Sequence, residues 1–392
     1  MKTLMRTWAD ISLDNLEHNY KQLRSRLPSG CRFLGVVKAD AYGHGAVPVS
    51  RALENFGAEY LAVANIEEAV QIRRGSVHLP VLILGYTPAD YAENMVFMDI
   101  TQEVHSLSYA QELNEALSGT NCILNVHVKL DTGMTRLGFI AYESALTLPQ
   151  IVELSRLPHL HIEGAFTHFA AADSTAESDR EFTRLQYARF TDMLSQMEAA
   201  GVKPEIRHCC NSGATILYPE YAMDMVRPGI AIYGAHPSDD TRAFLELRPV
   251  MSLHTSIAQI KTVPAQTAVS YGRTFSTSAE RKLAVLPVGY ADGLPRALSG
   301  KAAFRLHGRD VPVLGRICMD MCMVDVTDVP ELRAGDTLTL FGYDEDGALV
   351  PCERLTDAIG TISYELFCQI SKRVPRLYLE GGRVSEILQY ID

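Results

Sequence analysis

A short apolar segment runs directly into a lysine in the stretch Phe33-Leu34-Gly35-Val36-Val37-Lys38-Ala39-Asp40-Ala41-Tyr42-Gly43-His44-Gly45. Residues 33–37 are apolar throughout, which is typical of a strand buried on both faces. At the end of such a strand the Lys38 amine is costly to bury unless it is paired or used chemically. No G-x-G-x-x-G fingerprint follows the strand, so the segment does not indicate a dinucleotide-binding sheet.

Seven further apolar runs follow the first, and helical patterns lie between them. The eight runs are Phe33–Val37, Tyr60–Val63, Val81–Leu84, Met98–Thr101, Ile123–Leu130, Leu160–Thr167, Glu205–Cys209 and Met223–Val226. The helical patterns include Pro48–Phe56, Ile66–Arg74, Ser108–Leu117 and Ser178–Ala200, the last followed by Gly201 where a helix cap is expected. Eight strand–helix units in about 245 residues match the usual size of a (β/α)8 barrel, whereas a doubly wound sheet needs no eighth strand.

The pattern changes from about residue 246, where β-type runs are separated by Gly, Pro and Asp. These runs are Ser252–Val263, Lys282–Val288, Ala303–Leu306, Val311–Leu314, Met321–Val326 and Thr337–Leu340, and only Pro351–Gly360 looks helical among them. The sequence therefore predicts a barrel domain over residues 1–245 and a β-rich domain over residues 246–392. The first ten or so residues are a candidate to pack with the second domain rather than with the barrel.

Composition excludes several classes of function. The chain has 392 residues, and 36 Lys and Arg against 47 Asp and Glu give a formal charge of −11. This acidic balance argues against general binding of nucleic acid or of anionic lipid. No apolar run is long enough for a membrane-spanning helix or a signal peptide, so we expect a cytoplasmic protein. Among the eight cysteines, Cys318 and Cys322 have a spacing that zinc sites sometimes use, but no second pair follows, and we predict no metal site.

Residues with reactive or charged side chains follow several of the predicted strands at their carboxyl ends, where the active sites of such barrels lie. Lys38 follows the first strand, Arg136 the fifth and His168 the sixth. A lysine there can form a covalent bond with a carbonyl, and an arginine can bind a carboxylate. Taken singly, each also has an ordinary explanation. Lys38 could extend its amine to solvent, Arg136 could be a surface loop residue, and His168 could be a structural hydrogen-bonding residue.

The seventh and eighth strands end in segments suited to a phosphate. Asn211-Ser212-Gly213-Ala214 stands at the start of a predicted helix, where N–H groups and a hydroxyl can converge on an anion. The alternative there is an ordinary helix cap without a ligand. Arg227-Pro228-Gly229-Ile230 follows the eighth strand, and its glycine allows the backbone to approach a ligand closely.

The motifs taken together resemble the alanine racemase family over nearly the whole chain. Residues 37–45 are similar to the pyridoxal-phosphate signature of that family. The other motifs follow in the family's order: Lys129–Gly138, Thr167-His168-Phe169, Asn211-Ser212, Arg227-Pro228-Gly229-Ile230, Val269-Ser270-Tyr271-Gly272, Val288-Gly289-Tyr290-Ala291-Asp292-Gly293, Gly315-Arg316-Ile317-Cys318-Met319-Asp320 and Ile362-Ser363-Tyr364-Glu365. The resemblance implies an N-terminal (β/α)8 barrel, a C-terminal β domain and the cofactor pyridoxal 5′-phosphate.

The resemblance also implies roles for individual residues. Lys38 would bind the cofactor covalently and act as one acid/base group, and Tyr271 from a second subunit would be the other. Arg227 would face the pyridine nitrogen as a donor that keeps its own proton, Arg136 the phenolic oxygen, and His168 would hydrogen-bond Tyr271. The remaining cofactor contacts, mostly to the phosphate, would be Tyr42, Asn211, Ser212, Gly229, Ile230 and Tyr364.

Substrate contacts and a modification are implied in the same way. Arg136 and the backbone of Met319 would bind the substrate carboxylate, and Tyr290 would line the approach of the substrate. Lys129 stands where many members carry a carbamate. Because Tyr271 and Met319 would act on the neighbour's cofactor, the resemblance implies a homodimer with shared active sites. Racemisation needs a group on each face of the α-carbon, which explains the lysine and tyrosine pair.

Three alternative functions stay open at this point. An amino-acid decarboxylase of the same two-domain plan would place a carboxylate at the pyridine nitrogen, where this chain has Arg227. A non-catalytic pyridoxal-phosphate-binding protein would lack the β domain that holds Tyr271 and Met319. A serine or broad-specificity racemase tends to carry Asn at the position of Tyr364. We therefore expect an alanine racemase that supplies D-alanine for peptidoglycan, with serine as a slow substrate.

Overall fold

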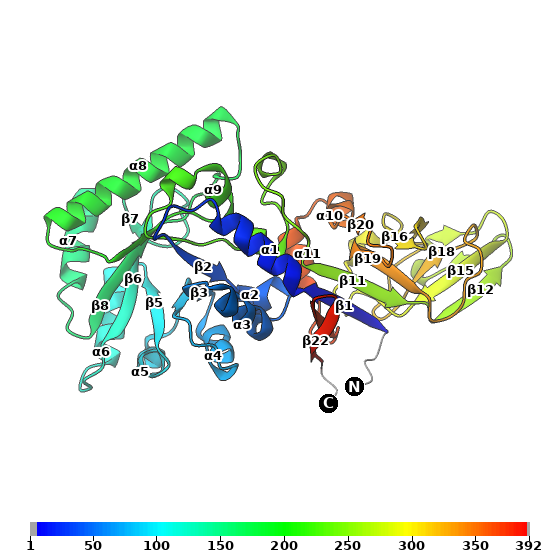
Figure 1. Cartoon of the computed structure of the whole chain (residues 1–392), viewed down its shortest axis with the longest axis horizontal. Coiled ribbons are helices and arrows are strands. Elements are labelled where there is room, and N and C mark those ends of the chain that lie inside the picture. The colour runs from blue at the N-terminus through cyan, green and yellow to red at the C-terminus, as the bar shows by residue number, and fades with distance from the viewer. Residues whose placement is uncertain (1–5, 390–392) are drawn as a thin grey trace. The chain divides into compact units, whose positions relative to one another are not determined.

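The computed structural model describes residues 6–389 (Figure 1). Their contacts divide them into two compact units. The barrel unit comprises residues 17–41 and 46–248, and the β unit comprises residues 6–16, 42–45 and 249–389. The short segment Tyr42–Gly45 thus interrupts the barrel unit along the chain. The junction between Arg248 and Pro249 falls three residues beyond the sequence boundary at 245 and 246.

The barrel unit contains one parallel sheet in the order β10-β2-β3-β4-β5-β6-β8-β9, with the two-residue β7 (Phe139–Ile140) paired to β6. The strands are β2 (Arg32–Val36), β3 (Tyr60–Val63), β4 (Val81–Ile83), β5 (Ile100–Val104), β6 (Leu124–Asp131), β8 (Leu160–Phe166), β9 (Ile206–His208) and β10 (Met225–Val226). Two backbone hydrogen bonds, from Asp224 N to Arg207 O (3.1 Å) and from Arg227 N to Cys210 O (2.9 Å), link the outer strands. The sheet is therefore a nearly closed barrel, as the eight apolar runs predict.

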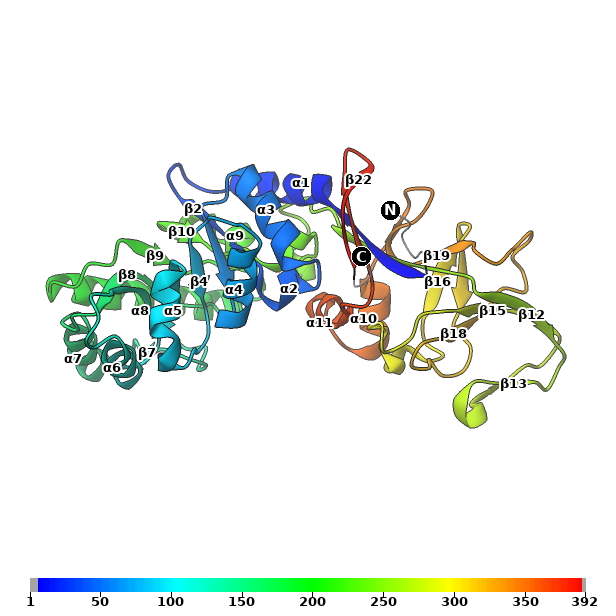
Figure 2. The ribbon, with the colours of Figure 1, turned by 90° about the horizontal axis from the view of Figure 1, so that it is seen from below.

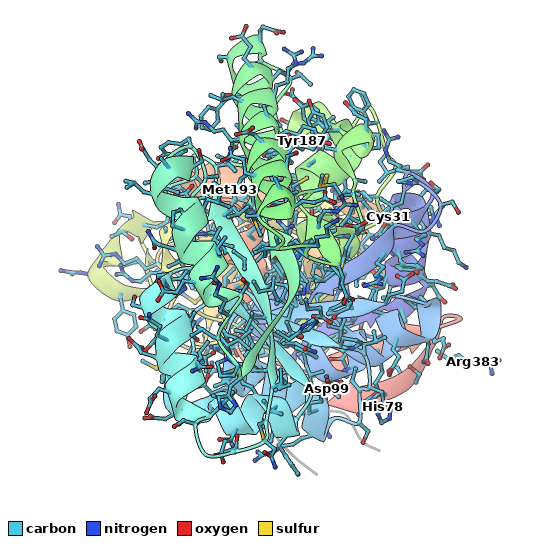
Figure 3. All side chains as sticks on the ribbon, turned by 90° about the vertical axis from the view of Figure 1, so that its left-hand side faces the viewer. Cys31, His78, Asp99, Tyr187, Met193 and Arg383 are labelled. Carbon is cyan, nitrogen blue, oxygen red and sulfur yellow. The ribbon has the colours of Figure 1, made fainter. Side chains whose placement is uncertain are left out.

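Helices pack outside these strands (Figures 1 and 2). They are α3 (Ala46–Phe56), α4 (Ile66–Arg74), α5 (Ala92–Phe97), α6 (Leu107–Ala116), α7 (Ser144–Leu154), α8 (Glu177–Ala199) and α9 (Ser212–Leu217). Figure 3 shows Met193 and Tyr187 on α8. Met193 is buried, and the Tyr187 ring stacks on Tyr221 at 4.0 Å. The four helical patterns read from the sequence are confirmed to within two residues, and Gly201 follows α8 with a φ of 88°.

Two barrel strands begin two residues later than their apolar runs predict, β10 at Met225 and β5 at Ile100. The run Met98–Thr101 suggested a strand from Met98, but β5 begins at Ile100. Met98 instead caps the end of α5, where its N–H donates to Asn94 O (3.0 Å), and Asp99 then adopts a φ of 52°. The left-handed residue turns the chain, so the strand can start only after it.

The β unit is built on a second sheet in the order β17-β16-β19-β11-β1-β21-β22, with β20 (Leu349–Val350) paired to β19. Its strands are β1 (Thr7–Ser12), β11 (Met251–Ser256), β16 (Ala303–Leu306), β17 (Arg309–Pro312), β19 (Thr337–Tyr343), β21 (Arg376–Glu380) and β22 (Arg383–Leu388). A three-stranded sheet joins β12 (Gln259–Val263), β15 (Arg281–Leu286) and β18 (Cys322–Asp325). The hairpin of β13 (Ala268–Val269) and β14 (Phe275–Ser276) packs against this sheet, because Val269 and Phe275 share one hydrophobic cluster with Leu283 of β15.

Residues 7–12 lie inside this sheet as β1, antiparallel to β11 and parallel to β21. Residues 1–5, which belong to the N-terminal segment considered above, lie outside the described residues. Helix α1 (Leu13–Arg24) follows β1 directly. Among residues 6–389, every helix is too short or too polar to cross a membrane.

Three sequence expectations for the β unit are wrong. The run Ser252–Val263 is two strands, because Ile257 and Ala258 bond to Asp336 and Val285 and carry the chain from one sheet to another. The run Val311–Leu314 is displaced, because β17 spans Arg309–Pro312. A second helix, α11 (Ser363–Gln369), follows α10 (Glu353–Ile359). Its buried Ser363, Leu366 and Phe367 show helical spacing over too few residues to stand out in the sequence.

Candidate active site

Lys38 begins a left-handed turn at the end of β2. The turn is α2 (Lys38–Tyr42), in which residues 39–42 have φ values of 53°, 55°, 54° and 51°. Each left-handed residue costs about 1–2 kcal/mol, so other bonds must hold the turn. Ala39 N donates to Glu68 Oε1 (2.7 Å), and Ala46 N donates to Asp40 Oδ1 (2.8 Å). The strained turn therefore fixes the backbone on which the lysine stands.

Gly43 continues this segment at a crowded point of the β unit. Its φ is 79°, and a Cβ built on it would lie 2.1 Å from the carbonyl oxygen of Phe367. The guanidinium of Arg376 donates to Gly43 O from Nε (3.1 Å) and Nη2 (3.0 Å), and Tyr378 donates to His44 O (2.9 Å). Both side chains are buried, so this part of the loop is tied down within the β unit.

We expect Gly43→Ala to lower the free energy of unfolding by about 3 kcal/mol or more, because strain at positive φ adds to a backbone clash. Gly30→Ala is the matched control, since Gly30 has a φ of 83° but nothing within 4 Å of its added Cβ. That variant should lose only about 1 kcal/mol. Urea unfolding of both variants measures the difference, and equal losses would show that the Phe367 contact does not matter.

Four basic side chains of the barrel unit lie close enough to His168 to lower its pKa through their charges. Burial, followed by the charges of Arg227, Arg136, Lys129 and Lys38, holds the pKa of His168 well below its ordinary value. All five residues lie at or just after the carboxyl ends of β2, β6, β8 and β10. Positive charges collected at one point repel one another, and an anionic ligand relieves that repulsion. The arrangement therefore favours a ligand with phosphate or carboxylate groups.

Arg227 is buried and held in one orientation, with 3% of its surface exposed. Nη1 lies 3.0 Å from His208 Nδ1, and Nη2 donates to Thr167 O (2.7 Å) and Cys209 O (3.2 Å). Nη2 also lies 3.4 Å from His168 Nδ1. The guanidinium carbon is 5.3 Å from the centre of the Phe166 ring. Burial lowers the pKa of Arg227 to about 10, so the side chain remains a cation and a donor at neutral pH.

Lys129 lies at the end of β6 with 4% of its surface exposed. Burial is the main cause that lowers its pKa to about 8, and Arg136, Arg227 and Lys38 lower it further while Glu103 opposes them. The amine lies over the Phe166 ring at 5.3 Å. A large share of this amine is therefore neutral in mildly alkaline solution, unlike the amine of an ordinary surface lysine.

The predicted phosphate segments meet in the barrel unit through a serine hydroxyl. Ser212 Oγ accepts from the backbone N–H of Gly229 (2.8 Å) and of Ala231 (3.4 Å). Asn211 caps α9, because its side chain accepts from Ala214 N (3.0 Å). Since Ser212 Oγ accepts these bonds, its own proton remains available to a ligand. The helix cap considered as the alternative is thus present at Asn211, and it lies next to the Ser212 hydroxyl.

Tyr271 is presented at the tip of the β13–β14 hairpin in the β unit. It begins the short 3-10 turn η5 (Tyr271–Arg273) and is 71% exposed. The hairpin is anchored by the two residues that precede Tyr271. Ser270 donates to Arg316 O (2.6 Å), and Val269 packs in a buried cluster with Leu283 and Leu314. The side chain therefore projects outward from a fixed base.

Met319 and Tyr290 lie on two turns that support each other. Tyr290 N donates to Cys318 O (3.1 Å) and Ala291 N to Met319 O (3.0 Å). Gly289 permits this packing, because an added Cβ would lie 2.3 Å from both carbonyl oxygens. Met319 is 53% exposed and Tyr290 is 43% exposed.

Asp292 anchors the same turns through its carboxylate. Its side chain binds Arg373 Nε (2.8 Å), Arg6 Nη2 (2.6 Å) and Gly289 N (2.9 Å). Burial by itself would raise the pKa of Asp292, but these hydrogen bonds hold it below its ordinary value. The carboxylate therefore stays charged and keeps the two turns in place.

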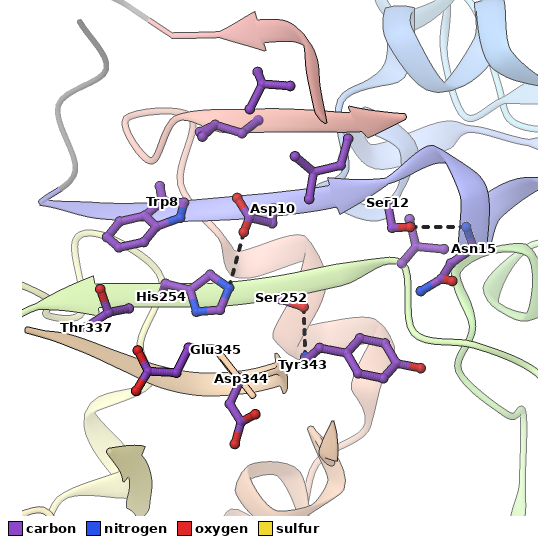
Figure 4. A pocket seen from close by; sticks show the side chains of 14 residues that line it. Trp8, Asp10, Ser12, Asn15, Ser252, His254, Thr337, Tyr343, Asp344 and Glu345 are labelled. Atoms are coloured by element: carbon purple, nitrogen blue, oxygen red, sulfur yellow. Dashed lines mark hydrogen bonds and ion pairs between the residues drawn. The ribbon is translucent and has the colours of Figure 1, made fainter. Parts of the chain in front are cut away.

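The two predicted phosphate tyrosines lie together in the β unit. The rings of Tyr42 and Tyr364 are 6.0 Å apart. A separate cavity of about 550 Å³ in the same unit is lined partly by Trp8, Asp10 and His254 (Figure 4). Asp10 pairs with His254 at 3.4 Å there. None of the residues singled out in the sequence lines this cavity, so it is not the predicted site.

The strand ends of the parallel barrel bring four cations together, and the β unit that follows in sequence carries an exposed tyrosine. These features define a barrel enzyme that acts on a small anionic compound. Models of the alanine racemase N-terminal and C-terminal domains match residues 11–237 and 250–378. The chain is 45% identical to an alanine racemase of Desulfovibrio desulfuricans over 373 residues, which are 95% of this chain and 98% of the relative. It is 42% identical to alanine racemase 2 of Caldanaerobacter subterraneus over 98% of each chain.

A solved structure gives the same answer. The alanine racemase of Clostridium difficile 630 superimposes with a TM-score of 0.94 and 40% identity, with 100% of both chains covered. This chain therefore belongs to the alanine racemase family, whose members are isomerases.

The sequence overlooked a group of polar residues inside the barrel. His127, Glu163 and His208 lie within β6, β8 and β9 and bond to one another in line with Arg227. The available signal was the presence of titratable residues inside otherwise apolar strands. Asp292 was quoted only as part of a motif, although its carboxylate holds the turns of Tyr290 and Met319 in place.

Proposed function

We propose that this protein interconverts L-alanine and D-alanine with pyridoxal 5′-phosphate as cofactor, and that it supplies D-alanine for peptidoglycan. The observation that carries the proposal is the set of four basic side chains around His168 in a chain of the alanine racemase family. Cofactor and substrate each bring an anionic group, phosphate in one and carboxylate in the other, and the strand ends supply matching cations.

The residues present fit the cofactor in three respects. Ser212 keeps a hydroxyl proton to donate, beside the backbone of Gly229 and Ile230. Arg227 is a buried donor that remains protonated, which suits a ring nitrogen that accepts a hydrogen bond. Lys38 supplies a primary amine for a covalent bond to a carbonyl. We assign the phosphate to Tyr42, Ser212, Gly229, Ile230 and Tyr364, the phenolic oxygen to Arg136, and a further cofactor contact to Asn211.

Two groups of the chain move the proton. When bound, pyridoxal phosphate withdraws electrons from the α-carbon and so makes its proton acidic. Lys38 takes or returns a proton at one face of that carbon, and Tyr271 does so at the other face. His168 hydrogen-bonds Tyr271 and orients its hydroxyl. A single base could not readily serve both faces, so inversion needs both residues.

The substrate carboxylate is bound by Arg136 and by the backbone of Met319, and Tyr290 lines its approach. Tyr271, Met319 and Tyr290 are exposed on a single chain, which fits residues that serve a neighbour's site. We therefore propose a two-fold homodimer in which each active site needs both chains. Tyr364 keeps the pocket small, so alanine is the preferred substrate and serine the slower one.

The cofactor assignment is tested by reduction with borohydride in the presence of pyridoxal phosphate, followed by peptide mapping. The expected result is a pyridoxyl group on Lys38 alone among the nine lysines that the chain contains. Removing the cofactor by dialysis should abolish alanine inversion, and adding it back should restore it. Label on another lysine, or inversion without the cofactor, would refute the assignment.

We predict that the extent of carbamylation of Lys129 rises with pH. Only a neutral amine reacts with CO2, and the pKa of Lys129 is about 8, so the neutral fraction rises steeply as the pH passes from 7 to 9. With 13C-labelled bicarbonate, we expect a carbamate carbonyl signal in carbon NMR that grows over this pH range. The signal should be missing in Lys129→Met. Persistence of the signal in that variant would place the carbamate elsewhere.

A further inference from the structure

A continuous chain of hydrogen bonds crosses the barrel from Arg227 to a carboxylate. Arg227 Nη1 lies 3.0 Å from His208 Nδ1, and His208 Nε2 lies 2.8 Å from His127 Nδ1. His127 Nε2 lies 3.0 Å from Glu163 Oε2. Both imidazoles are completely buried. The four residues come from β6, β8, β9 and the end of β10, so the chain joins four strands of the barrel.

The barrel is built to hold this chain. A Cβ on Gly164 would lie 2.6 Å from the His127 ring, so only glycine leaves room for that ring. The pairing of β6 with β8 shifts register between Val126 and His127, and the extra residue on β8 is Glu163, which therefore stands beside the pair of His127 and Gly164. The Phe166 ring stacks on His208 at 4.9 Å and 10°. These features cost sheet regularity, and their common effect is to align two imidazoles.

The carboxylate at the far end is held by further donors. Tyr60 donates to Glu163 Oε1 (2.9 Å), and Thr101 donates to Oε2 (3.3 Å). Burial alone would raise the pKa of Glu163, but the bonds from His127, Tyr60 and Thr101 hold it below its ordinary value. Glu163 is therefore an anion, and it can only accept hydrogen bonds.

The positions of the protons follow from the two ends of the chain. Arg227 can only donate, so His208 Nδ1 must be without a proton, and His208 carries its proton on Nε2. That N–H donates to His127 Nδ1, which leaves His127 Nε2–H to donate to Glu163. A doubly protonated His127 would force both nitrogens of His208 to accept, which no neutral imidazole can do. One arrangement satisfies all three bonds.

We infer that Glu163, through His127 and His208, is a positioning residue that fixes the orientation of Arg227 and its donor role toward the cofactor ring. The functional part of this inference rests on the proposed function, because it places Arg227 at the pyridine nitrogen. The chain connects one cation to one anion through two neutral rings, so it neutralises Arg227 without placing an anion beside the cofactor. A carboxylate in direct contact with Arg227 would instead compete with the cofactor ring for the guanidinium N–H groups.

The first test reads the protons directly in the unmodified protein. Nitrogen NMR of protein labelled with 15N-histidine distinguishes the two neutral tautomers from the imidazolium, and loss of signals in His127→Phe and His208→Phe gives the assignment. Both buried histidines should carry a single proton on Nε2. An Nδ1–H tautomer or an imidazolium at either position would overturn the inference.

The second test separates positioning from folding with matched variants. His127→Phe breaks the row of hydrogen bonds between Arg227 and Glu163. Tyr60→Phe removes one hydrogen bond to the Glu163 carboxylate and leaves that row intact. Loss of a residue that orients a functional group typically lowers affinity or activity roughly tenfold or more. His127→Phe should therefore weaken pyridoxal phosphate binding and lower kcat by about tenfold, while the KM for alanine stays within about twofold. Glu163→Gln keeps an acceptor for His127 and should lie between the two.

The control variant Tyr60→Phe should stay within about twofold of the parent in cofactor affinity and kcat. Equal losses in Tyr60→Phe and His127→Phe would show a merely structural role and overturn the inference. If His127→Phe does not fold, the inference is tested by comparing Glu163→Gln with Tyr60→Phe in cofactor affinity and kcat. The tautomers are measured without substrate, so failure of the proposed racemase activity and failure of the hydrogen-bond chain would be seen separately.

Discussion

Replacing Lys38 with alanine should lower kcat for alanine inversion by roughly 10^4-fold or more, because one change removes both the covalent attachment and an acid/base group. The fold should survive, since the backbone N–H groups of Ala39 and Ala46 hold the left-handed turn through hydrogen bonds to Glu68 and Asp40. Chiral chromatography of alanine measures the rate, and thermal unfolding measures the stability.

The control for this prediction is Lys21→Ala. Lys21 is a surface lysine of the barrel unit, 65% exposed and paired with Glu17. A surface ion pair contributes little, so this variant should keep its full rate. Retention of more than about a hundredth of the parent rate in Lys38→Ala would mean that another residue of the chain holds the cofactor.

Replacing Tyr271 with phenylalanine should lower kcat by roughly 10^2- to 10^4-fold, because it removes a single hydroxyl that transfers a proton. Unfolding temperature and cofactor absorbance should not change, since the ring is 71% exposed and its hairpin is anchored by Ser270 and Val269. Tyr91→Phe, at a tyrosine that is 47% exposed, is the matched surface control. A non-catalytic pyridoxal-phosphate-binding protein would be indifferent to both substitutions.

The same two variants test whether active sites are shared. If Lys38 and Tyr271 act from different subunits, a hybrid dimer of Lys38→Ala and Tyr271→Phe contains one intact site and one doubly defective site. Random re-association of equal amounts should then restore about a quarter of the parent activity. A mixture that stays inactive, although the subunits exchange, would place both groups in one chain.

The barrel could be predicted because its signal is local and repeated. Each buried strand is a short apolar run, and chemically able residues such as Lys38, Arg136 and His168 stand where those runs end. The β unit was harder, because its sheet joins β1 to β11 and β21 across most of the chain. Long-range pairing of that kind leaves no periodic trace in any one segment.

The functional site, like the fold, could be predicted only in part from the sequence. The basic residues could be named from the sequence, but their convergence on His168 depends on the closure of the barrel. The buried chain through His127 and Glu163 could not be predicted, because a register shift beside His127 and the absence of a side chain at Gly164 make the room for it. A polar residue in an apolar strand indicates that a partner exists, but not which residue it is.

The most direct measurement is chiral analysis of L-alanine and of L-serine, each incubated with the purified protein, with pyridoxal phosphate added and with it omitted. We predict conversion of alanine to an equal mixture of D and L forms, faster than that of serine, and only with the cofactor. Faster conversion of serine would contradict the proposed role of Tyr364 in the substrate pocket. Failure to invert either amino acid with the cofactor bound would contradict the proposed activity itself.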